Sequence, residues 1–158
     1  MIDPTNQASH VIFREATLQD YKGLHAVRIA VTENRLSNPL RITEADYALY
    51  LTERGKGWLC EIANEVVGFA IVDTIDNNIW ALFVHPTVEG RGIGKRLQQI
   101  MLDWFFHQST RTLWLSTGQG TKAERFYELT GWKRTGTKTS DGEIKFEMAL
   151  EDWQKAMQ

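Results

Sequence analysis

The sequence predicts an α/β fold built around a mixed β-sheet of about seven strands, part antiparallel and part parallel. Short apolar or alternating segments typical of strands alternate along the chain with segments whose apolar residues recur every three or four positions, as in helices. The 158 residues contain no internal repeat, low-complexity segment or linker. A single domain over residues 1–158, with its core over about 11–150, is therefore expected.

The N-terminal part of the chain predicts one strand followed by two helices. The segment HVIFREAT is typical of a short strand, and the apolar residues that follow it recur at helical spacing. Thr17 with Asp20, and Thr43 with Asp46, each place a capping residue three positions before an acid, which is the pattern of a capping box. One helix is therefore expected after Thr17, and a second from Thr43 to about Arg54.

The rest of the chain predicts three strands, a long helix, a strand, a short helix and two final strands. GWLCEIA and VVGFAIVD are separated by Asn64 and Glu65, a two-residue link typical of a hairpin. IWALFV is a run of six apolar residues, which indicates a strand buried on both faces. A long helix from about Arg91, the strand RTLWLST, the helix KAERFYELT ended by Gly131, and the strands GWKRTGT and EIKFEMAL complete the order β-α-α-β-β-β-α-β-α-β-β.

Composition excludes several classes of function. The formal net charge of −2 gives no field that would attract nucleic acid or an anionic membrane, and no apolar run is long enough to span a bilayer. The N-terminus lacks the apolar region of a signal peptide, and the single cysteine, Cys60, excludes an internal disulfide framework. We expect a cytoplasmic protein in which Cys60 is a buried, inert thiol. The four histidines, His10, His25, His85 and His107, show no metal-ligand spacing, so no metal is expected.

The stretch HPTVEGRGIGKRL places three glycines at alternate positions, 90, 92 and 94, between a strand and a helix. A helix start exposes unpaired N–H groups, and glycines let a bulky anion approach them closely, so the pattern predicts a pyrophosphate site. A glycine-rich turn with solvated basic residues is the alternative. Glu89 and Lys95 stand where a P-loop and a dinucleotide fingerprint, respectively, would need a glycine or another small residue, so neither motif fits.

Two blocks resemble the GNAT superfamily, the GCN5-related N-acetyltransferases. The acyl-CoA motif of that family is V-x-P followed by Q/R-x-x-G-x-G/A, and here Val84-His85-Pro86 precedes residues 89–94, EGRGIG. The segment AERFYELTGW (123–132) is similar to the second family block, and the element order matches over about 11–150. Three positions depart from the pattern: Glu89 replaces glutamine or arginine, Gly120 replaces asparagine, and Asn78 stands where some members have a glutamate base.

The resemblance implies acetyl-CoA as co-substrate, direct transfer of its acetyl group to an amine, and a cleft between two splayed central strands. It implies that the cofactor's pantetheine arm pairs with backbone groups of Leu82, Phe83 and Val84. It also implies that the pyrophosphate lies on Glu89, Gly90, Arg91, Gly92, Ile93, Gly94 and Lys95. Tyr127 matches the family's frequent general acid; the alternative is a packing role for its ring.

The acceptor amine is expected between the segment VTENRLSNPLRIT and the final strands. Arg28, Glu33, Asn34, Trp58 and Trp80 are the candidates that would shape its site. Glu33, or a water relay to solvent, is a candidate general base, although a solvated carboxylate at a helix end explains Glu33 as well. Charges there have mixed sign, so the sequence does not identify the acceptor.

Two other functions stay open. A non-catalytic CoA-binding sensor or partner module on the same fold would explain the departures at Glu89, Gly120 and Asn78. An unrelated nucleotide-binding α/β domain is disfavoured by the motif spacing. A homodimer is implied by resemblance alone.

Overall fold

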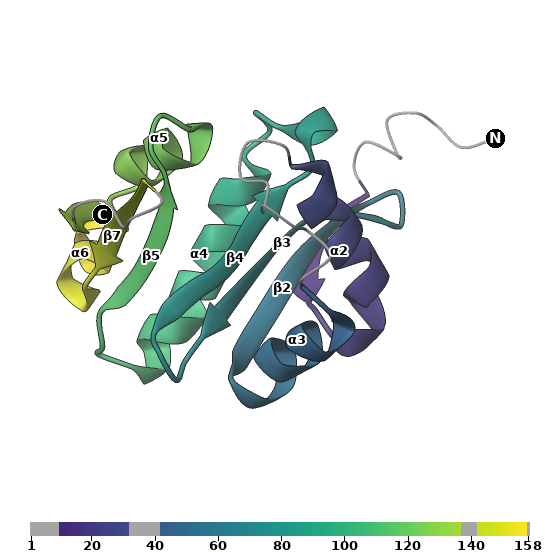
Figure 1. Ribbon diagram of the computed structural model, residues 1–158, viewed down its shortest axis with the longest axis horizontal. Helices are drawn as coiled ribbons and strands as arrows, with labels where there is room; N and C mark the ends of the chain where they lie inside the picture. Colours follow the sequence, from purple (N-terminus) through teal and green to yellow (C-terminus); the bar gives the residue numbers. More distant parts are fainter. Residues whose placement is uncertain (1–9, 32–41, 137–141, 158) are drawn as a thin grey trace.

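The protein is built around a seven-stranded mixed sheet with the strand order β1-β2-β3-β4-β5-β7-β6 (Figure 1). A computed structural model describes residues 10–31, 42–136 and 142–157 of the chain. All neighbouring strands are antiparallel except β4 and β5, which run parallel, so the predicted mixed sheet is confirmed. The strands are β1 (Val11–Glu15), β2 (Gly55–Ile62), β3 (Glu65–Asp73), β4 (Asn78–Val84), β5 (Leu113–Gly118), β6 (Lys133–Gly136) and β7 (Glu143–Met148).

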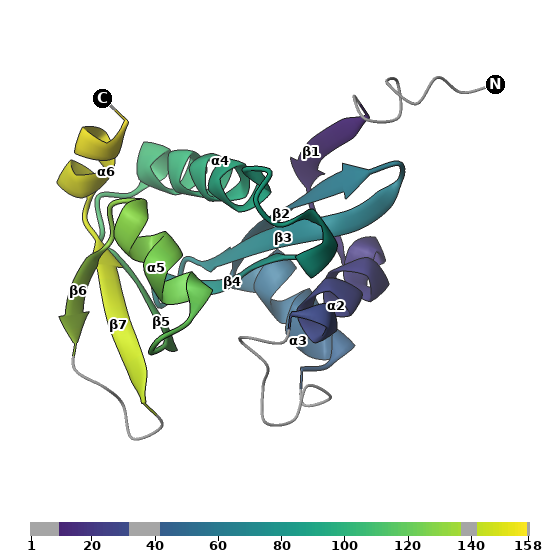
Figure 2. The same ribbon diagram turned by 90° about the horizontal axis from the view of Figure 1, so that it is seen from above.

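Helices cover both faces of the sheet: α4 and α5 lie on one side, α2 and α3 on the other (Figure 2). Within the described ranges, no helix combines the length and the apolar character needed to cross a bilayer. The helices are α2 (Tyr21–Ala30), α3 (Glu44–Ala48), α4 (Ile93–Gln108), α5 (Lys122–Leu129) and α6 (Leu150–Ala156). A π-helical turn, Leu49–Glu53, continues α3, and 3₁₀ turns lie at Leu18–Asp20 and Pro86–Val88.

The predicted caps explain where these helices begin. The backbone N–H of Thr43 donates to the Asp46 carboxylate at 2.7 Å, and the Asp46 N–H donates to the Thr43 hydroxyl at 3.3 Å, which is a complete capping box. The Thr17 N–H likewise donates to Asp20 at 2.8 Å. Gly131 adopts a left-handed φ of 99° just after α5, as a C-terminal glycine should.

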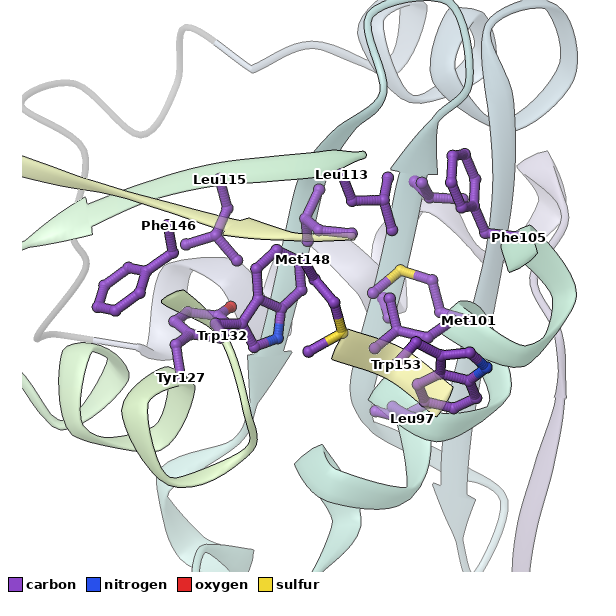
Figure 3. Close-up of a cluster of buried hydrophobic side chains, with 14 of the residues drawn as sticks. Leu97, Met101, Phe105, Leu113, Leu115, Tyr127, Trp132, Phe146, Met148 and Trp153 are labelled. Atoms are coloured by element: carbon purple, nitrogen blue, oxygen red, sulfur yellow. The ribbon is translucent and has the colours of Figure 1, made fainter. Parts of the chain in front are cut away.

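Two apolar cores lie on opposite faces of the sheet. The larger packs α4 and α5 against the strands; Figure 3 shows Leu97 and Met101 of α4 near Trp153 of α6, and Tyr127 of α5 near Phe146 of the sheet. The smaller packs α2 and α3, with Tyr47 at its centre. Side chains of β3 alternate between the two cores, because successive residues of a strand point to opposite faces.

The central strands β4 and β5 pair at one point and then diverge (Figure 1). That point is Asn78 opposite Trp114, where the Asn78 amide donates to the Trp114 carbonyl at 3.2 Å. The Trp114 N–H donates to the Asn77 carbonyl at 2.9 Å, and its indole N–H donates to the Asp76 carbonyl at 3.0 Å. The expected splayed strands are therefore confirmed, and Asn78 holds the point from which they separate.

Three sequence expectations need correction. The run IWALFV is not buried on both faces, because residues 82–84 of β4 border the opening between the strands and are partly exposed. The strand that is buried on both faces is β3. The β2–β3 link is Ala63 and Asn64, both with positive φ, one position earlier than expected. Helix α6 was not predicted, and its Trp153 stacks on Phe106 at 6.0 Å between ring centroids.

Cys60 lies fully buried in β2, as expected. Burial raises the pKa of its thiol to about 11, with Glu61 adding to the effect, so the reactive thiolate is scarce at neutral pH. We expect less than about one tenth of the folded protein to be labelled by a thiol reagent at pH 8 within minutes, against full labelling in denaturant. Rapid labelling of the folded chain would show that Cys60 is accessible.

Candidate functional site

A pocket of about 640 Å³ opens where β4 separates from β5, bounded by the N-terminal ends of α4 and α5. Its volume is within the usual range for small-molecule and cofactor sites. The sequence placed ten residues at the cofactor; nine of them line this pocket, and Arg91 does not. The lining residues are Val31, Leu82, Phe83, Val84, Val88, Glu89, Gly90, Gly92, Ile93, Gly94, Lys95, Lys122, Ala123, Phe126 and Tyr127.

The glycine loop presents backbone N–H groups to this pocket. Gly90 and Gly92 both have φ of +80°, a left-handed conformation that side chains other than glycine rarely adopt. Helix α4 begins directly after Gly92, and its first intrahelical bond runs from the Arg96 N–H to the Gly92 carbonyl at 3.0 Å. The N–H groups of residues 93–95 therefore precede the hydrogen-bonded turns and are available to an anion at the positive helix end.

Gly94 lies at the start of α4, near Val84 of β4 and Phe126 of α5. A Cβ built at this position would stand 3.4 Å from Val84 and 3.9 Å from Phe126, which is ordinary contact rather than a clash. The absence of a side chain at Gly94 therefore serves to leave space in the pocket, since the protein alone could accommodate an alanine there. Space of this kind admits a ligand close to the backbone.

Glu89, the acid at the edge of the anion loop, is paired with a lysine. Its carboxylate lies 3.3 Å from the Lys122 ammonium at the start of α5, and both side chains line the pocket. The pair lowers the local negative charge near the helix end, which explains how the loop accommodates an acid. The same pairing draws the Lys122 ammonium toward Glu89, and an exposed pair of this kind contributes little stability.

Glu89→Gln is accordingly expected to strengthen acetyl-CoA binding by roughly two- to tenfold, with the gain shrinking at high salt. The change removes a negative charge beside the anion loop and with it the ion pair between Glu89 and Lys122. Calorimetric titration of both proteins at two salt concentrations measures the effect. Glu65→Gln, an exposed change at the start of β3, is the control, and weaker binding by Glu89→Gln would contradict this account of the loop.

Tyr127 of α5 lines the pocket, and its ring belongs to the larger core. The ring packs on Trp132 at 5.7 Å and on Phe146 at 6.1 Å between centroids, so its orientation is fixed (Figure 3). Burial raises the pKa of the Tyr127 hydroxyl above its ordinary value. The group is therefore neutral over the whole physiological range and keeps its proton as a hydrogen-bond donor.

Strand β4 supplies the opposite wall through an edge without strand partners. Beyond Asn78, the described residues place no strand against the side of β4 that faces β5. A bulge lies at Trp80, because Ala81 pairs with Ile71 while Ile79 pairs with Val72. Residues 82–84 thus border the pocket with backbone groups that an extended ligand can use.

The candidate acceptor residues are only partly brought together. Arg28 of α2 and Trp80 of β4 lie side by side on the α2 face of the sheet, next to the pocket-lining Phe83. Trp58 was placed wrongly: it packs on Trp104 of α4, on the other face. Glu33 and Asn34 lie outside the described residues.

The two other departures from the family pattern have local explanations. Gly120 has φ of +78°, and its N–H donates to the Glu124 carboxylate at 2.6 Å, so it shapes the turn before α5. The amide of Asn78 is used to hold the Trp114 carbonyl and is not aimed at the pocket. Within the described part of the chain, no three acidic, histidine or cysteine side chains gather as a metal site would require.

Comparison with known proteins agrees with this geometry. The model of the "Acetyltransferase (GNAT) family" matches residues 18–132. The chain belongs to the GNAT family of acetyltransferases. It is 30% identical over 71 residues to the [ribosomal protein bS18]-alanine N-acetyltransferase of Haemophilus influenzae; this match covers 44% of the chain and spans about half, 49%, of that relative.

Solved structures share the GNAT fold at low sequence identity. The ribosomal-protein-S18-alanine N-acetyltransferase of Escherichia coli has a TM-score of 0.72 at 17% identity, covering 89% of this chain and 94% of its own. The PaiA N-acetyltransferase of Thermoplasma acidophilum, in complex with coenzyme A, has a TM-score of 0.76 at 14% identity. The match covers 88% of this chain and 98% of that one. A Bacillus anthracis protein in complex with acetyl coenzyme A has a TM-score of 0.69 at 17% identity. The match covers 88% of this chain and 99% of that one.

Several pocket residues escaped the sequence analysis. Lys122, Ala123 and Phe126 come from α5, and Val88 and Val31 come from the loop before α4 and the end of α2. The α5 residues carried a usable signal, since they belong to the same block as Tyr127 and a helix places residues three and four apart on one face. Val31 carried none, because its place depends on how α2 packs against β4.

Proposed function

We propose that this GNAT protein transfers an acetyl group from acetyl-CoA directly to an amine. The observation that carries the proposal is one continuous pocket with three kinds of wall. The free N–H groups at the start of α4 lie on one side, the open edge of β4 on another, and Tyr127 of α5 lines a third. An anion site, a strand-like groove and a hydrogen-bond donor are together what a CoA thioester requires.

Each wall has a distinct task in this proposal. The N–H groups of residues 90–95 bind the pyrophosphate, and residues 82–84 pair with the pantetheine arm as an added strand would. A backbone N–H near Phe83 polarises the thioester oxygen as the amine attacks. The amine nitrogen forms a bond to the acetyl carbon, and the carbon–sulfur bond breaks to release CoA thiolate, so no acyl-enzyme is needed.

Tyr127 is proposed to stabilise that leaving thiolate. A free thiol has a pKa of about 8.5 and tyrosine one of about 10, and burial raises the pKa of Tyr127 further. Full transfer of the tyrosine proton to the thiolate is therefore unfavourable, whereas a hydrogen bond from the hydroxyl to sulfur is favourable. Of the two roles that fit a tyrosine here, hydrogen-bond stabilisation is the one that its buried surroundings support.

The proton lost by the amine needs a base that the described residues do not identify. Asn78 cannot serve, since an amide is not basic and its side chain holds the Trp114 carbonyl. Glu33 and a relay through water remain the proposed routes. The cytoplasmic location and the homodimer likewise remain proposals.

Thermal unfolding with acetyl-CoA, CoA and ATP, followed by an assay of CoA thiol release with an amine panel, tests the proposal. A ligand at 100 times its Kd adds about 2.7 kcal/mol of stability, which raises the Tm by several degrees in a domain of this size. A shift with both CoA ligands but not ATP, together with thiol release, supports the enzyme. A shift without turnover of any amine favours a non-catalytic CoA-binding module, and no shift overturns both.

A further inference from the structure

Arg28 of α2 is a buried cation to which the chemistry above gives no task. It is only 8% exposed, although it is an arginine on a helix next to the sheet. Its guanidinium carbon lies 4.7 Å over the Trp80 ring and 4.8 Å over the Phe83 ring. Its Nε donates to the Tyr47 hydroxyl at 3.2 Å. The side chain is therefore held in one place by aromatic groups.

One end of this guanidinium has no hydrogen-bond partner among the described residues. The Nη2 atom is buried and unpartnered there, and Arg28 takes part in none of the ion pairs found in the described ranges. Asp46, the acid whose charge acts on Arg28, is committed to the Thr43 N–H at 2.7 Å. Burial lowers the pKa of Arg28, and the opposing effects of Tyr47 and Asp46 do not offset this lowering.

Such an arrangement is costly unless a ligand completes it. A buried charged donor without a partner destabilises a fold, and an apolar side chain would fill the same space without that cost. The aromatic rings stabilise the faces of the guanidinium, but its N–H groups point outward in its plane. A carboxylate is the partner that fits this edge, since its oxygens accept a charge-assisted hydrogen bond from a guanidinium N–H such as that of Nη2.

The position of Arg28 indicates which molecule would supply the carboxylate. Phe83 contacts the guanidinium on one side and lines the pocket, and Val31, one helical turn after Arg28, also lines it. Arg28 is thus next to the part of the pocket where the acetyl group would lie, on the face of β4 opposite α4. The pyrophosphate site, at the start of α4, lies on the other face.

We propose that Arg28 binds a carboxylate carried by the acceptor, so that the substrate is an amine that also bears an acid group. This inference rests on the proposed acetyl transfer. Both a free amino acid and a peptide with an acidic residue next to its amino terminus have that chemistry. Arg28 acts here as a specificity-determining residue, fixing the acceptor so that its amine faces the thioester.

Matched acceptor pairs test the inference. The acids L-alanine, β-alanine and L-glutamate are compared with L-alaninamide, β-alaninamide and L-glutamine, and the peptide amide Ala-Glu-Ala with Ala-Gln-Ala. Thiol release gives kcat/KM, and thermal unfolding of the CoA-loaded protein reports binding without turnover. We expect the wild-type protein to favour at least one acid over its amide by about tenfold or more. If the preference appears among the free amino acids, the acceptor is a free amino acid, and if it appears only in the peptide pair, the acceptor is a peptide.

Variants of Arg28 and of its neighbour separate recognition from packing. Arg28→Gln is expected to abolish the preference for the acid, and Arg28→Lys to keep only part of it, because lysine retains the charge without the fork of donors. Tyr47→Phe removes the hydroxyl that Nε contacts but leaves the cation, so the preference should persist. Acetyl-CoA should still raise the Tm of all three variants.

Equal binding and turnover of acids and amides by the wild-type protein would overturn the inference. A preference that survives in Arg28→Gln would do the same. If Arg28→Gln does not fold, the preference of the wild-type protein for acids over amides, and its reduction in Arg28→Lys, still test the inference. A CoA-dependent Tm shift without any preference for acids rejects the carboxylate site alone, whereas loss of the CoA shift itself rejects the proposed function.

Discussion

Gly92→Glu is expected to abolish the rise in Tm that acetyl-CoA produces in the wild-type protein. Gly92 caps α4 with a φ of +80°, and in the described part of the chain no atom beyond its chain neighbours lies within 4 Å of a Cβ built there. A glutamate therefore meets open space, and that space is where the pyrophosphate should lie. Its carboxylate would occupy the anion site and repel the ligand, weakening binding at least about 100-fold, or about 2.7 kcal/mol.

Gly142→Glu is the matched control. Gly142 has a similar left-handed φ of +86°, and among the described residues no atom beyond its chain neighbours lies within 4 Å of a Cβ built there, but it is not among the pocket residues. Both variants should lose about 1–2 kcal/mol of stability, because a side chain is strained in this conformation. Only Gly92→Glu should lose the response to acetyl-CoA, and an unchanged affinity would show that the loop does not hold the pyrophosphate.

Tyr127→Phe is expected to lower kcat by roughly 100-fold while changing acetyl-CoA affinity less than about threefold. Phenylalanine keeps the ring that packs on Trp132 and Phe146, so the fold is preserved. What disappears is the hydroxyl that is proposed to donate a hydrogen bond to the leaving thiolate. Steady-state kinetics, together with direct titration of acetyl-CoA, separate the two effects.

The pH dependence provides a second test of Tyr127. Because burial raises the pKa of its hydroxyl, the group stays protonated, and kcat should show no decline from its ionisation below about pH 10. Tyr21→Phe, which removes a hydroxyl on α2 outside the pocket, should leave kcat unchanged. Equal kcat for Tyr127→Phe and the wild type would assign Tyr127 to packing alone.

Most of the fold could be predicted from local patterns. The capping acids Asp20 and Asp46, the strands and the glycine turn depend on residues close together in the sequence, so spacing alone located them. Helix α6 was missed because it is short and is preceded by Ala149 in place of a usual capping residue; only Asp152, which accepts the Ala149 N–H at 2.9 Å, indicated its start.

The parts of the site that lie within one sequence motif were predicted, and the contacts between distant parts of the chain were missed. Residues 89–95 and Tyr127 belong to two motif blocks, and the structure places nearly all of them in one pocket. Glu89 and Lys122 are 33 positions apart in the sequence, so no local sequence pattern predicts that they pair. Trp58 was misplaced because a tryptophan in a strand can face either side, and only the register with β3 decides which.

The single pairing of β4 with β5 has a consequence for the whole molecule. Seven strands are counted as one sheet, yet β1–β4 and β5–β7 are two half-sheets that, among the described residues, share a single strand pairing, Asn78 opposite Trp114, while α4 and α5 pack in the core that joins them. A pantetheine arm lying between them would act as a missing eighth strand. The cofactor would then be a structural component that completes the hydrogen bonding of the sheet, so the supply of acetyl-CoA would also set how firmly the two halves are joined.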